Sequence, residues 1–195
     1  AGRTVRAGDL VIVPVDRCMT HDSLTPEVLD ALHDGLGCER VYDPDRVAVI
    51  IDHVAPAASV ATADAQARVR RWVAEQDIRH FYDVGAGVCH QVMIEKGLVA
   101  PGQVALGTDS HATSYGAVGA FGTGVGSTDM ALALASGRTW LRVPETVRVR
   151  ASGRFRPRVG AKDLSLHLCG LLGLGGANYH AVEFHGLGWL SLDGR

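Results

Sequence analysis

The sequence lacks the features that mark secreted, membrane-spanning and nucleic-acid-binding proteins. Its 195 residues include four widely spaced cysteines and no C-x-x-C pair, which argues against a disulfide scaffold or a zinc ribbon. No apolar run reaches the roughly 18 residues that a membrane-spanning helix needs, and no signal peptide is visible. We therefore expect no membrane partner, a cytoplasmic location and reduced thiols.

The chain also lacks a strong excess of charge. Its formal net charge is -2 at pH 7, and its arginines are scattered along the sequence. Proteins that bind nucleic acid gather basic residues into a stripe, so we expect no nucleic-acid partner. What the chain does have is a high apolar content, 47% hydrophobic against 21% charged, which indicates a packed core.

Apolar runs alternate with helical patterns along the chain. Continuous apolar strands are typical of a parallel sheet that is covered on both faces, so the fold class is α/β with a mostly parallel sheet. Residues 146–155 alternate apolar and charged side chains and predict a hairpin or an edge strand, with a possible subdomain change near residue 145. The main predicted strands are 9–15, 46–51, 81–84, 104–106 and 181–184, and the main predicted helices are 25–37, 64–78, 127–137 and 163–172.

Acids and histidines follow several of these strands directly. Because ligands bind at the carboxyl ends of parallel strands, we expect these side chains to converge on one crevice. A carboxylate that binds one imidazole nitrogen fixes the tautomer and raises the basicity of the ring, which suits it to proton transfer. Taken singly, each group has an ordinary structural explanation as a turn or a core histidine. The residues are Asp52, His53, His90, Asp109, Ser110, His111, Glu183 and His185.

A glycine-rich stretch follows the third of these clusters. Gly122, Gly124 and Gly126 resemble a phosphate-binding loop, but Ser127 breaks the spacing G-x-G-x-x-G and no G-K-[ST] follows. The glycines are better explained by close backbone packing, or by backbone N–H groups that face an anionic ligand.

Four motifs, IIDH, GVCHQ, GTDSH-x-T with its trailing glycines, and VEFHG, are spaced along the chain as in one known family. On these motifs the chain resembles the aconitase superfamily, most of all the large subunits of 3-isopropylmalate dehydratase and homoaconitase. The resemblance implies a three-layer α/β/α fold, incomplete here. It also implies a lyase with a [4Fe-4S] cluster that dehydrates and rehydrates a hydroxy-di- or tricarboxylic acid.

The first expected substrate is 3-isopropylmalate, an intermediate of leucine biosynthesis, with homoaconitase or aconitase-type isomerisation as alternatives. In this family a small swivelling subunit or domain supplies the catalytic base. The resemblance assigns departure of the substrate hydroxyl to the pair Asp52 and His53. Two further histidine–acid pairs are His90 with Asp109, and His111 with Glu183. The expected substrate contacts are His21 and Ser110.

The cysteines depart from the family pattern. The three cluster ligands of the family lie downstream of VEFHG in C-T-N and C-x-x-C motifs, and none of the four cysteines here stands in such a motif. We therefore expect residues 1–195 to form an N-terminal segment of a longer polypeptide. Such a segment would have no cluster ligand of its own and would be inactive alone.

Two other classes of function stay open at this point. A mononuclear zinc hydrolase could use His180, Glu183 and His185, although alternation along a strand places His180 on the face opposite the other two. A non-catalytic interaction module is the second alternative. It is disfavoured because a pure scaffold needs no set of paired acids and histidines.

Overall fold

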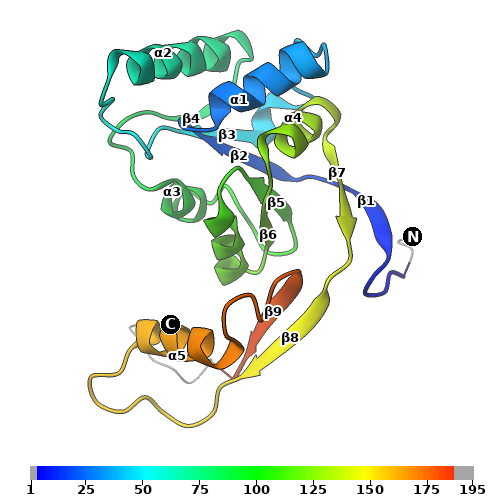
Figure 1. Ribbon diagram of the computed structural model, residues 1–195, viewed down its shortest axis with the longest axis vertical. Coiled ribbons are helices and arrows are strands. Elements are labelled where there is room, and N and C mark those ends of the chain that lie inside the picture. Colours follow the sequence, from blue (N-terminus) through cyan, green and yellow to red (C-terminus); the bar gives the residue numbers. More distant parts are fainter. Residues whose placement is uncertain (1–3, 187–195) are drawn as a thin grey trace. The chain divides into compact units, whose positions relative to one another are not determined.

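The computed structural model describes residues 4–186, which form two units (Figure 1). The first, here called the sheet unit, is Ile12–Trp140; the second, the terminal unit, consists of the described residues up to Val11 and from Leu141 onward. Strands β1 (Leu10–Pro14) and β7 (Arg138–Arg142) pair in a two-stranded sheet. Between residues 4 and 186, no helix combines the length and the apolar character that crossing a membrane demands.

The sheet unit is built on a parallel sheet of five strands in the order β4-β3-β2-β5-β6. The chain enters at the central strand β2, adds β3 and β4 on one side, and then returns to the other side of β2 to add β5 and β6. The strand order therefore reverses between β2 and β5, which is where open α/β sheets place their ligand sites. The strands are β2 (Arg17–His21), β3 (Val47–Ile50), β4 (His80–Tyr82), β5 (Val104–Gly107) and β6 (Phe121–Gly124).

Helices cover both faces of this sheet. Alternate strand residues point to opposite faces: Val49 packs in one buried cluster and its neighbour Ile50 in the other. The cluster with Val49 is closed by α1 (Thr25–Asp30), α2 (Val60–Glu75) and α4 (Ser127–Ser136), and the cluster with Ile50 by α3 (Cys89–Glu95) and the 3-10 helix η3 (Ser110–Val118). Helix, sheet and helix thus form three layers, as the resemblance implied.

The prediction of a buried first strand is wrong. Leu10 and Ile12 of β1 are 72% and 73% exposed, and β1 lies outside the five-stranded sheet. The central strand β2, which the sequence analysis did not predict, reads RCMTH and yet is buried from Cys18 to His21. Apolar content alone did not predict which strands are buried, because the burial of a strand depends on the helices that cover it.

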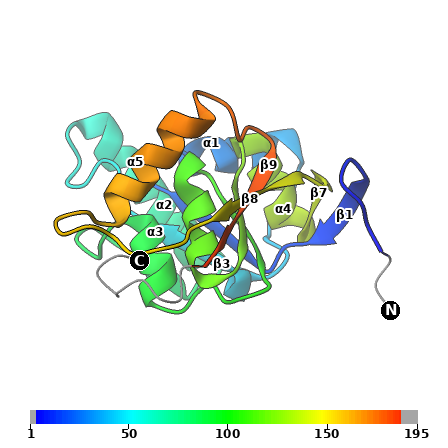
Figure 2. The same ribbon diagram turned by 90° about the horizontal axis from the view of Figure 1, so that it is seen from below.

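The terminal unit contains a second small sheet. Strands β8 (Glu145–Arg150) and β9 (His180–His185) pair in parallel from Glu145 opposite His180 to Arg150 opposite His185, and run side by side in Figures 1 and 2. The hairpin interpretation of this region is therefore wrong. Parallel neighbours need a crossover, and α5 (Ala161–Leu172) lies within it.

Candidate active site

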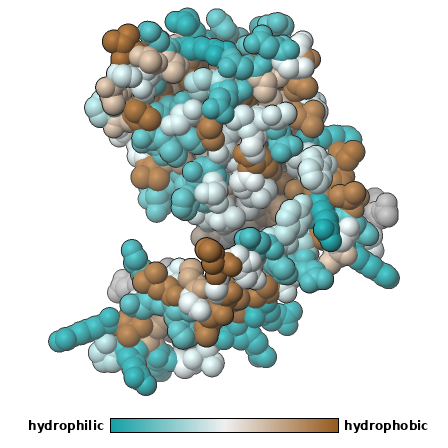
Figure 3. Space-filling view, in the orientation of Figure 1, coloured by the Kyte–Doolittle hydropathy of each residue, from teal (hydrophilic) through white to brown (hydrophobic). Residues whose placement is uncertain are grey.

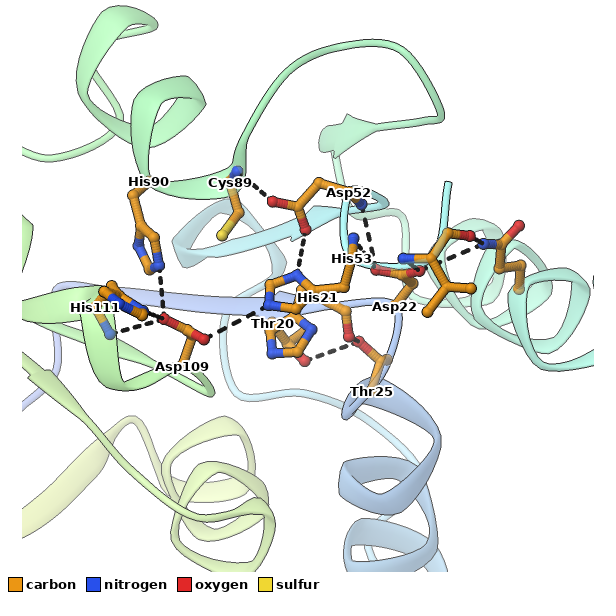
Figure 4. Close-up of polar contacts among 12 residues, drawn as sticks. Thr20, His21, Asp22, Thr25, Asp52, His53, Cys89, His90, Asp109 and His111 are labelled. Atoms are coloured by element: carbon orange, nitrogen blue, oxygen red, sulfur yellow. Dashed lines mark hydrogen bonds and ion pairs between the residues drawn. The ribbon is translucent and has the colours of Figure 1, made fainter. Parts of the chain in front are cut away.

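Acids and histidines gather at the carboxyl ends of β2, β3 and β5, at the reversal of strand order (Figure 4). His21 ends β2, and Asp52 and His53 follow β3. His90 stands in the first turn of α3, and Asp109 is the residue before η3. The sheet unit therefore brings together most of the residues that the sequence analysis singled out.

Asp52 fixes one side of the His53 ring. Its Oδ1 lies 2.7 Å from His53 Nδ1, and its Oδ2 accepts a 2.6 Å hydrogen bond from the backbone N–H of Cys89 at the start of α3. Neighbouring side chains of an extended strand point apart, but the chain turns here and lets the pair meet. The His53 side chain keeps 33% of its surface exposed. Its other nitrogen, Nε2, is thus the atom at which a proton can be exchanged.

Asp109 connects three histidines through one carboxylate. Oδ1 lies 2.9 Å from His90 Nε2 and 2.9 Å from His111 Nδ1, and it accepts the backbone N–H of His111 at 2.7 Å. Oδ2 lies 3.5 Å from His53 Nε2. Burial raises the pKa of Asp109, but the hydrogen bonds from His111 and His90 outweigh it and hold the pKa well below its usual value. Asp109 is therefore ionised across the physiological range.

His21 stacks on His53. The ring centroids are 3.7 Å apart and the planes differ by 14°. His21 is only 3% exposed, and neither ring nitrogen has a hydrogen-bond partner among the residues that the structure describes. Burial, followed by the neighbouring His53, lowers the pKa of His21 from its ordinary 6.5. His21 is expected to stay neutral where its neighbour carries charge.

The carboxylates act on His53 in the opposite sense. Burial lowers the pKa of His53, but the hydrogen bonds and charges of Asp52 and Asp109 outweigh it, so the pKa stands above 6.5. The two carboxylates therefore favour the protonated form of His53, which can give up its proton at Nε2. Such general acid–base help accelerates reactions by roughly 100- to 10,000-fold.

Ser110 opens η3 beside an open depression of about 680 Å³, counting the space that is open to solvent. Two glycines allow β6 to approach η3 closely. A Cβ atom on Gly124 would meet the backbone of Asp109 and Ser110, and one on Gly122 would meet the carbonyl oxygen of Ala112. Close backbone packing, one of the two predicted explanations for the glycines, is thus confirmed for Gly122 and Gly124 but not for Gly126, where a Cβ atom would meet nothing within 4 Å. The depression is lined by Thr108, Asp109, Ser110, Thr113, Thr123, Gly124, Val125 and Gly126.

Glu183 belongs to the terminal unit, on β9, where its carboxylate lies 3.4 Å from His185 Nε2. Its pairing with His111 stays a prediction. His180 Nδ1 instead hydrogen-bonds to the carbonyl of Asn178 at 2.7 Å, and its Nε2 lies 3.8 Å from the Glu145 carboxylate. Among residues 4–186, no set of side chains close enough to hold a metal includes residues 180, 183 or 185. The zinc alternative built on those residues therefore loses its geometric basis.

The cysteines do not fit an iron–sulfur cluster. Each potential metal-binding set within the described part of the chain contains at most one cysteine. Cys18 and Cys89 are buried, and burial raises the pKa of the Cys18 thiol to about 12, so it stays protonated and is a poor ligand.

Two residues of the site were missed in the sequence analysis. Asp22 and Gln66 are each 3% exposed and bind the turn that carries Asp52 and His53. Asp22 directly follows the unpredicted strand β2, so its place at a strand end went unseen. Gln66 lies on the inner face of a predicted helix, where a polar residue signals a specific buried partner.

Comparison with known proteins gives a family match and several similar chains. Residues 2–195 match the model of the aconitase family (aconitate hydratase). The chain is 57% identical over 192 residues to the 3-isopropylmalate dehydratase large subunit of Herpetosiphon aurantiacus, which covers 98% of this chain and 46% of that protein. It is 55% identical over 184 residues to the homoaconitase large subunit of Thermus thermophilus, covering 94% of this chain and 43% of the relative.

A third relative is the 3-isopropylmalate dehydratase large subunit 1 of Deinococcus radiodurans, 50% identical over 181 residues, with 93% of this chain and 41% of that one covered. The chain thus spans less than half the length of these curated relatives. The family match itself covers nearly every residue. The chain belongs to the aconitase family.

Proposed function

We propose that this protein is a hydro-lyase of the aconitase type, which dehydrates and rehydrates a hydroxy-di- or tricarboxylic acid. One observation carries the proposal: Asp52 holds His53 Nδ1 at 2.7 Å, while Asp109 binds His90 and His111 and lies 3.5 Å from His53 Nε2. The family match supports the reaction class. The arrangement suits a reaction whose difficulty is the movement of protons.

His53 is the proposed proton donor to the leaving hydroxyl. Hydroxide is a poor leaving group unless it is protonated as the C–O bond breaks. Because Asp52 occupies Nδ1, the transferable proton stands on Nε2, on the side of the ring that faces Asp109. The Asp109 carboxylate stabilises the imidazolium before transfer, and the reverse reaction returns the proton to the same nitrogen.

The proposed substrate is 3-isopropylmalate, with a place in leucine biosynthesis. Two of the three relatives above are named 3-isopropylmalate dehydratase, the first at 57% identity. The relative named homoaconitase follows at 55%, so homoaconitate is the alternative substrate. Hydroxyl groups at the open depression, those of Ser110 and Thr113, suit contacts with substrate carboxylates. His21 is proposed as a further substrate contact.

The cofactor and the partner follow from the family. A [4Fe-4S] cluster, when bound, supplies Lewis-acid chemistry at the substrate hydroxyl; we propose that cysteines other than the four in this sequence hold it. We also propose a small swivelling subunit or domain as partner, and Glu183 as an acid that pairs with His111. We propose that residues 1–195 serve as the N-terminal part of a large subunit.

The test uses the complete product of the gene, purified without oxygen, supplied with iron and sulfide, and mixed with its small-subunit partner. Formation of the unsaturated acid from 3-isopropylmalate, homocitrate and citrate is followed by ultraviolet absorbance. We expect turnover, fastest with 3-isopropylmalate, in protein that contains iron and sulfide. Zinc without iron, or no turnover of any of the three acids by protein with full iron and sulfide content, would contradict the proposal.

A further inference from the structure

Asp22 binds the turn that carries the catalytic pair. Its Oδ1 accepts the backbone N–H groups of Asp52 and His53 at 3.2 Å and 2.9 Å, and its Oδ2 accepts that of Val54 at 2.9 Å. Three consecutive N–H groups thus point at one carboxylate, and Figure 4 shows Asp22 beside Asp52 and His53. Residues 52–54 lie beyond β3 and their N–H groups bond to Asp22 and not to a neighbouring strand, so these bonds fix the path of the chain after β3.

Gln66 completes this arrangement from another layer. Its side-chain amide, on α2, donates to Asp22 Oδ2 at 3.3 Å and to the Val54 carbonyl at 2.7 Å. Both residues are 3% exposed. Burying a carboxylate costs free energy unless it is paired or hydrogen-bonded. Here the compensation comes from N–H groups of the very turn that presents Asp52 and His53.

The ionised form of Asp22 is the one that the site favours. Burial raises the pKa of Asp22, but the hydrogen bonds from His53, Val54, Asp52 and Gln66 outweigh it, and the pKa lies below its ordinary 3.8. An ionised carboxylate accepts at both oxygens, whereas an amide in the same place would turn one donor toward the backbone N–H groups.

We propose that Asp22 is a positioning residue: through the turn at residues 52–54, and with the help of Gln66, it holds Asp52 and His53 in the geometry that proton transfer needs. Asp22 takes no part in the chemistry, because its oxygens face the backbone of the turn. The inference rests on the proposed function only for its kinetic consequence. The effect on the His53 ring follows from the contacts alone.

Two variants and one control separate positioning from general stability. Asp22→Asn keeps the shape of the side chain but replaces one of its two acceptor oxygens by an NH2 group. Gln66→Met removes the amide without changing charge. The control is Asp16→Asn, at the opposite end of β2, where Asp16 Oδ2 accepts the backbone N–H of Val104 at 2.9 Å. The control loses a comparable backbone hydrogen bond far from the His53 ring.

The first readout is an NMR titration of His53 in the 195-residue chain, which does not depend on turnover. The pKa of His53, raised above 6.5 in the wild type, should fall toward 6.5 in both variants and stay unchanged in Asp16→Asn. The second readout is kinetic, in the complete gene product. We expect kcat to fall about 10- to 100-fold with KM little changed, because small misplacements of reacting groups act mainly in the transition state.

The outcomes are distinct. A fall of the His53 pKa in Asp22→Asn alone would reveal a pure charge effect and overturn the proposal. The proposal would also be overturned if both variants lost as much stability as Asp16→Asn but kept the His53 pKa and the kcat of the wild type. If Asp22→Asn does not fold, Gln66→Met decides alone, because it removes the two bonds by which Gln66 holds Asp22 Oδ2 and the Val54 carbonyl while leaving the charge of Asp22 in place. A wild type without turnover would refute the proposed function, whereas the titration would still decide the positioning role.

Discussion

Replacing Gly124 by alanine should disturb the candidate site through the backbone. A Cβ atom there would lie 2.7 Å from the carbonyl oxygen of Asp109, whereas ordinary contact begins at 3.4 Å, so the two segments must separate by about 0.7 Å. Asp109 Oδ1 binds His90 at 2.9 Å. A movement of that size along the bond would stretch this contact beyond hydrogen-bonding distance.

The expected cost is about 1–3 kcal/mol of unfolding free energy, the usual range for inserting a methyl group into a packed contact. Gly116→Ala is the matched control, because Gly116 lies in η3 and a Cβ atom there meets nothing within 4 Å. Alanine at that helical position should be neutral, or stabilising by roughly 0.5–1 kcal/mol. Urea unfolding of both variants measures the difference, and NMR of the His90 ring reports the lost bond.

Equal stabilities of the two variants would refute the argument that β6 must approach the Asp109 backbone closely. A Gly124→Ala protein that is destabilised but keeps the His90 ring signals of the wild type would refute the second step, because the clash would then relax away from the site.

Three further predictions follow from the contacts. In an NMR titration the pKa of His53 should lie above 6.5 and that of His21 below it, so that between the two pKa values His53 is charged and His21 is neutral. Asp52→Asn should lower the pKa of His53, and an unchanged pKa would show that Asp52 does not act on the His53 ring. The 195-residue chain alone, after treatment with iron and sulfide, should turn over neither 3-isopropylmalate nor homocitrate, and clear turnover would show that its own cysteines suffice. The chain should also bind a hydrophobic dye, since Figure 3 shows brown apolar side chains on the terminal unit, and Leu166, Leu171 and Phe184 of this unit are 60%, 68% and 52% exposed. A clean monomer without dye binding would contradict this.

The sequence predicted the parts of this fold whose signals are local. The helix that ends at Gly137 does so in a left-handed conformation, as its terminal glycine indicated. Strands that are apolar throughout, such as β3, were predicted correctly because this signal also lies within the segment itself. Strand β2 was not, because its burial comes from helices distant in sequence. The parallel pairing of β8 with β9 was missed because alternation in one segment does not identify its partner.

The site was predictable in its residue types and less so in its contacts. Placing Asp52 and His53 at a strand end followed from the apolar run before them. That one carboxylate, Asp109, would bind both His90 and His111 could not be read from spacing, because it depends on the meeting of α3 with η3. Asp22 escaped notice for a similar reason, since its partners lie 30 to 44 residues away along the chain.

The kcat of the His53→Ala variant tests the central claim most directly. It is measured in the complete gene product, at matched iron content, with 3-isopropylmalate as substrate. If His53 protonates the leaving hydroxyl, kcat should fall about 100-fold or more, equivalent to roughly 2.7 kcal/mol of transition-state stabilisation, while KM changes far less. A kcat equal to that of the wild type would show that His53 only packs the turn after β3, and would remove it from the mechanism.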